Sequence, residues 1–187
     1  MIIISIDVGY HNMAMVKIKT DDDFRLTVHD VHVINITKIY HKKVCRRDCK
    51  LPHTSEVADL MAHFIQEYGE ILDEADMVLI ERQPPTGLTQ IETLLLYLYR
   101  SKTHLVSPNS MHCHFNIGRY EYEKRKEHTI KIAESYLDGF ENLGRVHDAS
   151  DAVCLAIFHT HKERERIRLS KIDRSVPFDM YRYEDRV

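Results

Sequence analysis

Hydrophobic positions in the first part of the chain predict strands. Residues 2–6 are isoleucine at four of five positions, a β-branched run that is typical of a buried strand. A second apolar run over residues 13–18 follows after a short loop, which predicts an antiparallel partner. Residues 24–36, reached through the aspartate-rich turn at 21–23, predict a third strand, and the slip in phase of its apolar positions indicates a β-bulge. The chain is therefore expected to open with a three-stranded meander.

Beyond residue 54 the spacing of the apolar residues predicts amphipathic helices that alternate with short strands. Thr54 or Ser55 is expected to cap a helix whose apolar residues share one face. Strands are expected at 77–80 and 104–107, and helices at about 88–100, 121–137 and 148–161. Pro108 is expected to stop the last strand and to begin a loop that contains Gly118. This order predicts an α/β fold with a mixed five-stranded sheet, an antiparallel meander followed by parallel strands, flanked by helices.

The composition is that of an ordinary globular protein. The 187 residues are 43% hydrophobic and 29% charged, enough for one domain with a sizeable core. No apolar run reaches the length of a membrane span, and the first strand lacks the basic region that precedes a signal peptide's apolar core. Four cysteines are too few for a disulfide scaffold, which favours a reducing compartment.

Charge is distributed unevenly, although the formal net charge is only −3. Between residues 38 and 50 the basic residues are concentrated against a single acid, and such a patch favours phosphate contact. Two alternatives stay open for this stretch. Cys45 and Cys49, with His41 and His53 beside them, offer zinc ligands, although without the usual paired spacing, and the stretch could be a plain solvated loop. His112, Cys113 and His114 also look like metal ligands, but without a matching partner pair we interpret them as a non-metal segment.

Four carboxylates stand at the ends of predicted elements. Asp7 ends the first strand, Glu81 ends the strand at 77–80, and Asp148 and Asp151, three residues apart, share one face at the start of the last core helix. Each alone has an ordinary interpretation as a turn, strand-end or capping residue. If the four converge, their like charges require a cation. Oxygen ligands suit Mg²⁺, and two such ions can assist phosphodiester hydrolysis. Spacing alone does not show that they converge.

Three motifs carry a resemblance to a known family. The chain resembles the RuvC-type Holliday junction resolvases, which have a ribonuclease-H-like fold, in DVGYHN at 7–12, IERQ at 80–83 and HDASDA at 147–152. Its length and the sequences of these motifs match the poxvirus members of that family. The resemblance spans residues 2–161 and implies a nuclease domain over 1–161 followed by a charged tail over 162–187. Sugar kinases and actin-like ATPases also open with D-x-G, but they need a duplicated domain and a glycine-rich phosphate loop, and this chain has six glycines.

The resemblance also implies the catalytic roles. It implies that four carboxylates are catalytic and bind Mg²⁺: Asp7, Glu81, Asp148 and Asp151. It also implies two ions per site, with Mn²⁺ as a substitute. A lysine near the scissile phosphate would be Lys126, with Lys124 as the alternative.

The resemblance further implies the partners. These are four-way and branched DNA and a second copy of the chain, because paired cuts need two sites, with no nucleotide cofactor. The helix at 88–100 could supply the dimer interface or internal core. The residues expected to bind DNA are Lys42, Lys43, Arg46, Arg47, Lys50, Arg82, Gln83 and Arg119.

Some functional alternatives remain open at this level. One is a ribonuclease-H-like nuclease that acts on RNA–DNA hybrids or other branched DNA, and another is a nucleic-acid-binding module without catalysis. The resemblance to viral proteins implies a location in the host cytoplasm, where poxviruses replicate, with the virion as a second expected place.

Overall fold

The computed structural model describes residues 1–40, 49–140 and 143–170. Its five strands form one sheet in the order β3-β2-β1-β4-β5. The strands are β1 (Ile2–Asp7), β2 (Met13–Thr20), β3 (Leu26–Ile34), β4 (Met77–Glu81) and β5 (Thr103–Val106). The first three pair antiparallel, whereas β4 runs parallel to β1 and β5 parallel to β4. The predicted mixed sheet is confirmed.

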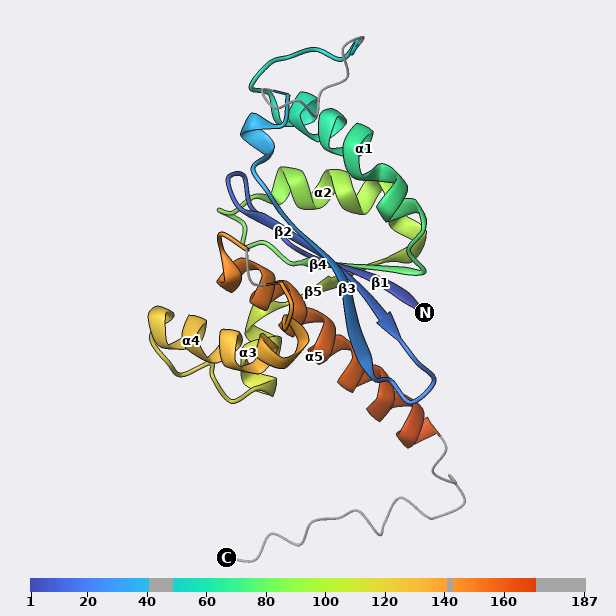
Figure 1. The fold of residues 1–187 in the computed structure, drawn as a ribbon, viewed down its shortest axis with the longest axis vertical. Coiled ribbons are helices and arrows are strands. Elements are labelled where there is room, and N and C mark those ends of the chain that lie inside the picture. The colour runs from blue at the N-terminus through green and yellow to red at the C-terminus, as the bar shows by residue number, and fades with distance from the viewer. Residues whose placement is uncertain (41–48, 141–142, 171–187) are drawn as a thin grey trace, which may run out of the picture.

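Helices cover both faces of this sheet (Figure 1). One face carries α1 (Val57–Asp73) and α2 (Thr89–Leu98), and the other carries α3 (Pro108–His114), α4 (Tyr122–Ala133) and α5 (Val146–Ser170). Short 3₁₀ turns occur at Ile36–Lys38, Arg100–Lys102 and Glu134–Tyr136. Among the described residues, no helix combines the length and apolar character that crossing a membrane requires.

The isoleucine run of β1 reflects its place in the middle of the sheet. Ile4 and Ile6 pack in one core with Phe64 of α1, and Ile3 packs in the other core with the residues of α5. Side chains alternate between the faces of a strand, so a central strand covered on both sides is apolar at nearly every position. The same burial fixes the register, because a shift by one residue would exchange the two faces.

Helix α5 packs closely against β1 through small side chains. Ala149, Ala152 and Ala156 are fully buried in this contact. The hydroxyl of Ser5, itself fully buried, donates a hydrogen bond of 2.6 Å to the Ala152 carbonyl oxygen. This bond ties the strand that ends in Asp7 to the helix that carries Asp148 and Asp151.

Several local details extend or correct the sequence-based expectations. The bulge in β3 lies at His29, since Lys17 pairs with Asp30 and Ile18 pairs with Val28. The expected loop after Pro108 is wrong, because α3 begins there. Proline lacks an N–H and has a fixed φ that suits the first helical position, and the Ser107 hydroxyl oxygen caps the helix by accepting from the Ser110 N–H at 3.4 Å.

The expected ends of two other helices also differ. The N-cap of α1 is Glu56, while the Thr54 hydroxyl accepts a hydrogen bond from the Glu56 N–H at 3.1 Å, so the expected cap at Thr54 or Ser55 is wrong. Helix α5 continues past His161 to Ser170. Its exposed last turns carry ion pairs three residues apart, of the kind that supports a solvated helix, such as Arg166–Glu163 at 2.9 Å.

Candidate active site

The parallel pairing of β1 with β4 brings two carboxylates to the same edge of the sheet. The register matches Ser5 with Leu79 and Ile6 with Ile80, so the next residues, Asp7 and Glu81, end neighbouring strands side by side. The two carboxylates act on each other, because the negative charge of Glu81 raises the pKa of Asp7.

The surroundings disfavour two negative charges at this edge. Burial raises the pKa of Asp7 well above its usual range, and the nearby charges of Glu81 and Asp151 raise it further. Burial also raises the pKa of Glu81, although hydrogen bonds from Asp7 and from Gln83, whose Nε2 donates at 3.0 Å, act in the opposite direction. Negative charge on this pair is therefore disfavoured, and a bound cation would offset it.

Helix α5 adds the remaining two carboxylates. Asp151 accepts a hydrogen bond from the Lys126 ammonium, and the same nitrogen lies 4.0 Å from an oxygen of Asp148. Asp148 is only 7% exposed, and its other contacts are Arg145 Nε at 2.8 Å and His147 Nε2 at 3.3 Å. The charges of Asp7, Glu81, Asp151 and Lys126 act on one another, and Asp148 joins this group through Lys126.

Lys126 is held as a cation at the centre of the acids. Burial lowers the pKa of its ammonium, but the charge and hydrogen bond of Asp151 outweigh this effect, so the pKa is raised. The nitrogen also lies 5.6 Å from the centroid of the Tyr122 ring. Lys124 is exposed instead, with its nitrogen 4.7 Å from the centroid of the Tyr120 ring. Of the two lysines considered, the structure places Lys126 at the carboxylates.

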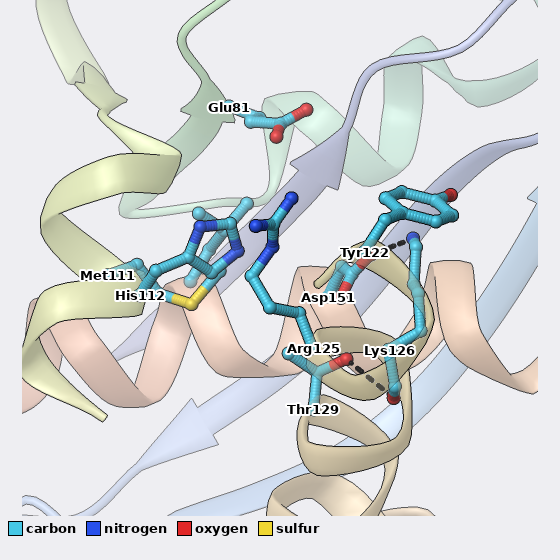
Figure 2. Close-up of a pocket in the computed structure, with 9 residues that line it drawn as sticks. Glu81, Met111, His112, Tyr122, Arg125, Lys126, Thr129 and Asp151 are labelled. Carbon is cyan, nitrogen blue, oxygen red and sulfur yellow. Dashed lines mark hydrogen bonds and ion pairs between the residues drawn. The ribbon is translucent and has the colours of Figure 1, made fainter. Parts of the chain in front are cut away.

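A cavity of about 120 Å³ opens between the acids and the neighbouring helices. Figure 2 shows Glu81 from β4 on one side of it, Lys126 and Asp151 on another, and His112 from α3 opposite. The cavity is lined further by three residues of α4: Tyr122, Arg125 and Thr129.

Tyr122 and Arg125 were missed as site residues from the sequence. Tyr122 lies four residues before Lys126 and three before Arg125, so its side chain is a helical neighbour of both, and a search for polar residues one turn from Lys126 could have led to them. Burial and the charge of Arg125 lower the pKa of His112, which keeps that ring neutral near pH 7.

The residues expected to bind DNA are placed in different ways. Arg82 is exposed directly after Glu81, and Arg119 is exposed at a second hollow of about 640 Å³ that shares His112 with the first. Gln83 is engaged internally, because its Nε2 donates to Glu81 and its Oε1 accepts from the Leu88 N–H at 3.4 Å. Lys50 is exposed ahead of α1. The other expected contacts lie outside the described residues: Lys42, Lys43, Arg46 and Arg47.

The sheet order, the helices on both faces and the acids at the ends of β1 and β4 place this chain in the RuvC-like group of ribonuclease-H-like folds. A family model described as the Poxvirus A22 protein matches residues 1–162. The chain therefore belongs to the poxvirus A22 protein family. A comparison with curated proteins finds no significant match.

Solved structures with this fold support the same placement. The fowlpox virus resolvase, solved with substrate Holliday junction DNA, aligns with a TM-score of 0.62 at 14% identity, over 87% of this chain and 99% of that chain. The yeast mitochondrial Holliday junction resolvase Ydc2 aligns at 0.62 and 17%, over 89% of this chain and 80% of that chain. Thermus thermophilus RuvC aligns at 0.55 and 12%, over 89% and 97%. At these identities the likeness shows the shared fold.

Proposed function

We propose that the protein is a metal-dependent endonuclease that resolves four-way (Holliday) DNA junctions. The observation that carries this proposal is the gathering of Asp7, Glu81, Asp148 and Asp151 around Lys126 at one edge of the sheet. Membership of the poxvirus A22 family supports it, as does the fold shared with the fowlpox virus resolvase, solved with Holliday junction DNA, and with the yeast mitochondrial Holliday junction resolvase Ydc2.

The carboxylates fit a hard divalent cation. Their donor atoms are all oxygens, which Mg²⁺ prefers, and the raised pKa values of Asp7 and Glu81 show that the site gains from added positive charge. Two Mg²⁺ ions, or Mn²⁺ as a substitute, would be held by Asp7, Glu81, Asp148 and Asp151. Held there, such a metal would supply activation of the attacking water and would offset charge on the phosphodiester.

The chain's own residues position the scissile phosphate and balance its charge. Lys126 is a fixed cation that would stabilise the negative charge that develops on the phosphate, and Tyr122 beneath it restricts where its ammonium can lie. Arg125 lines the cavity close to Lys126 and can bind a phosphate oxygen with its guanidinium. Gln83 orients Glu81 through its 3.0 Å hydrogen bond, so its part is to position the carboxylate.

DNA would approach the site over a rim of basic side chains. Arg82 is exposed directly after Glu81, Arg119 lines the second hollow, and Arg145 contacts Asp148. Contacts of this kind go to the phosphate backbone and fix the position of the nucleic acid, whatever its sequence. Lys50, and outside the described residues Lys42, Lys43, Arg46 and Arg47, remain proposed DNA contacts.

A homodimer follows from the proposed reaction, because symmetric cuts in opposing strands need two active sites. In α2, Ile91, Leu95 and Tyr99 at its end are buried in the core, whereas Tyr97 is 79% exposed and Leu98 52% exposed. These two exposed apolar side chains are available for a partner chain. Replacing both with glutamate should shift the sedimentation of the protein from dimer to monomer. The proposed location remains the host cytoplasm and the virion.

The test is cleavage of a labelled synthetic four-way junction with Mg²⁺ or Mn²⁺, beside linear duplex and RNA–DNA hybrid. Wild type should make paired symmetric nicks in the junction, and Asp7→Asn should make none. Asp22→Asn, an exposed turn residue, is the control for loss of an acid as such and should cut normally. Equal cutting of the hybrid would favour a ribonuclease, and tight junction binding without cleavage would favour a binding module.

A further inference from the structure

Three metal-binding side chains meet far from the carboxylates. Cys49 and His53 lie in the segment that leads into α1, and His63 lies within α1. The Cys49 Sγ and one ring nitrogen from each histidine all lie within 4.8 Å of one another. Helix α1 covers the face of the sheet opposite α5 (Figure 1), so this cluster is separate from the candidate active site.

His63 is arranged as a metal-ligating histidine. Its side chain is inside the protein, with the residue 3% exposed, and its Nε2 lies 3.1 Å from the Pro52 carbonyl oxygen. A carbonyl oxygen only accepts, so Nε2 carries the hydrogen and Nδ1 of the neutral ring presents a lone pair. Nδ1 faces the Cys49 Sγ at 3.8 Å. A carbonyl that fixes the far nitrogen of a ligand histidine is a regular feature of metal sites.

The spacing of the three groups suits a tetrahedral ion. With Zn–S near 2.3 Å and Zn–N near 2.05 Å, tetrahedral angles place a sulfur and a nitrogen about 3.6 Å apart. The observed 3.8 Å between Cys49 and His63 is close to this value. His53 is exposed, its ring stacks on Tyr40 with centroids 5.3 Å apart, and its centroid is 4.8 Å from that of His63. A small rotation of this surface ring would complete the approach.

Ligand chemistry determines which metal would bind. A thiolate with two imidazoles prefers zinc-class ions over Mg²⁺, which takes oxygen ligands. A cysteine–histidine pair alone could instead be a nucleophilic dyad. The second imidazole, from His53, has a ring nitrogen within 4.8 Å of the ligand atoms of both partners, and a dyad needs no second imidazole. The cluster therefore favours a metal.

We propose that Cys49, His53 and His63 form a zinc site that fastens the segment before α1 to that helix. The described residues supply three ligands, and the fourth tetrahedral position would be taken by water or another ligand. The basic stretch at 38–50 ends at Lys50, the residue after Cys49. Zinc bound to Cys49 would therefore fix the position of the end of that stretch. This inference does not depend on the proposed nuclease activity.

The test measures zinc binding to the untagged full-length chain against a chromophoric chelator. Wild type should bind one zinc ion at this site, and Cys49→Ser or His53→Ala should weaken that binding by more than about 100-fold, because even outer-shell changes weaken metal sites about 10- to 100-fold. Cys113→Ser, the loss of an exposed cysteine elsewhere, should bind zinc like wild type. With Co²⁺, the thiolate charge-transfer band should be present in wild type and absent in Cys49→Ser.

Two results would overturn the proposal. One is zinc binding that Cys49→Ser and His53→Ala leave unchanged, which would place the ion elsewhere. The other is alkylation of Cys49 that proceeds at the same rate with and without zinc, which would identify a thiol–imidazole pair without a metal. Circular dichroism of each variant shows that it is folded, and both variants replace residues that are not fully buried.

Discussion

Ser5 offers a sharp test of how the fold holds the carboxylates together. Its hydroxyl is fully buried between β1 and α5 and donates to the Ala152 carbonyl oxygen at 2.6 Å. Changing Ser5 to alanine removes one neutral hydrogen bond, worth about 1 kcal/mol. The Ala152 carbonyl still has the regular helical donor four residues on, so no buried acceptor is left without a partner. The expected loss in the free energy of unfolding is therefore small, about 0.5–1.5 kcal/mol.

Changing Ser5 to valine has a different expected effect. The side chain faces a contact made of fully buried alanines, including Ala149 and Ala152, and it would add bulk where no space is available. Overpacking of this kind costs about 1–3 kcal/mol and shifts the backbone. The shift would move α5 away from β1, and with it Asp151 away from Asp7. Cleavage should then fall by more than the loss of stability explains, because displacements of about 1 Å at a catalytic group reduce rates about 100-fold.

The assay combines urea unfolding with single-turnover cleavage of a four-way junction. Ser5→Ala should unfold slightly earlier and cut at close to the wild-type rate, whereas Ser5→Val should be impaired in both measurements under conditions where it is fully folded. Cleavage by a folded Ser5→Val at the wild-type rate would refute the reasoning. So would equal damage by both substitutions, because only one of them adds volume.

Further predictions concern the turn at Gly9, the two lysines of α4 and the partly buried His159. A Cβ on Gly9 would lie 2.8 Å from the Asn12 carbonyl oxygen, so Gly9→Ala should lower the free energy of unfolding by about 1–3 kcal/mol, as measured by urea unfolding. Lys126→Met should slow single-turnover cleavage by about 100- to 1,000-fold, while Lys124→Met, the matched control, should stay close to wild type. Burial, and next the charge of His104, lower the pKa of His159. Below about pH 6.5 the unfolded chain therefore binds a proton that the folded protein resists, and stability falls with decreasing pH. His159→Leu should reduce this slope in unfolding curves between about pH 5 and pH 8, and an unchanged slope would contradict the assignment.

The sequence predicted most elements because their periods are local. The isoleucine run of β1, the helical spacing of α1 and the phase slip at His29 are each visible within a dozen residues, and the sheet has the predicted order of antiparallel and parallel pairs. Helix α3 was missed because Pro108 was interpreted as a stop, although Ser107 before it is a capping residue. The same residue pair can end a strand and begin a helix.

The sequence alone could not show which distant side chains come together in the fold. Asp7 and Glu81 are 74 positions apart and meet only because β4 pairs parallel to β1, and the resemblance to resolvases supplied their association in advance. His63 was not suspected as a ligand, because it lies among the buried residues of α1 and looks like part of its apolar face. Cys49 and His53 are candidate ligands from the sequence, but only the fold brings them to His63. Contacts between distant segments depend on packing that no local period encodes.

The bulge at His29 has a consequence for the free protein in solution. β3 is one edge of the sheet, and a long regular edge is a template on which other chains can add strands. Here the ladder is interrupted at His29 and followed by Asp30 and His32, which form a 3.0 Å ion-pair contact, while the opposite edge, β5, has only four residues. Both borders of the sheet thus resist strand addition. Deleting His29 would restore a continuous edge, and its first sign would be concentration-dependent aggregation during refolding.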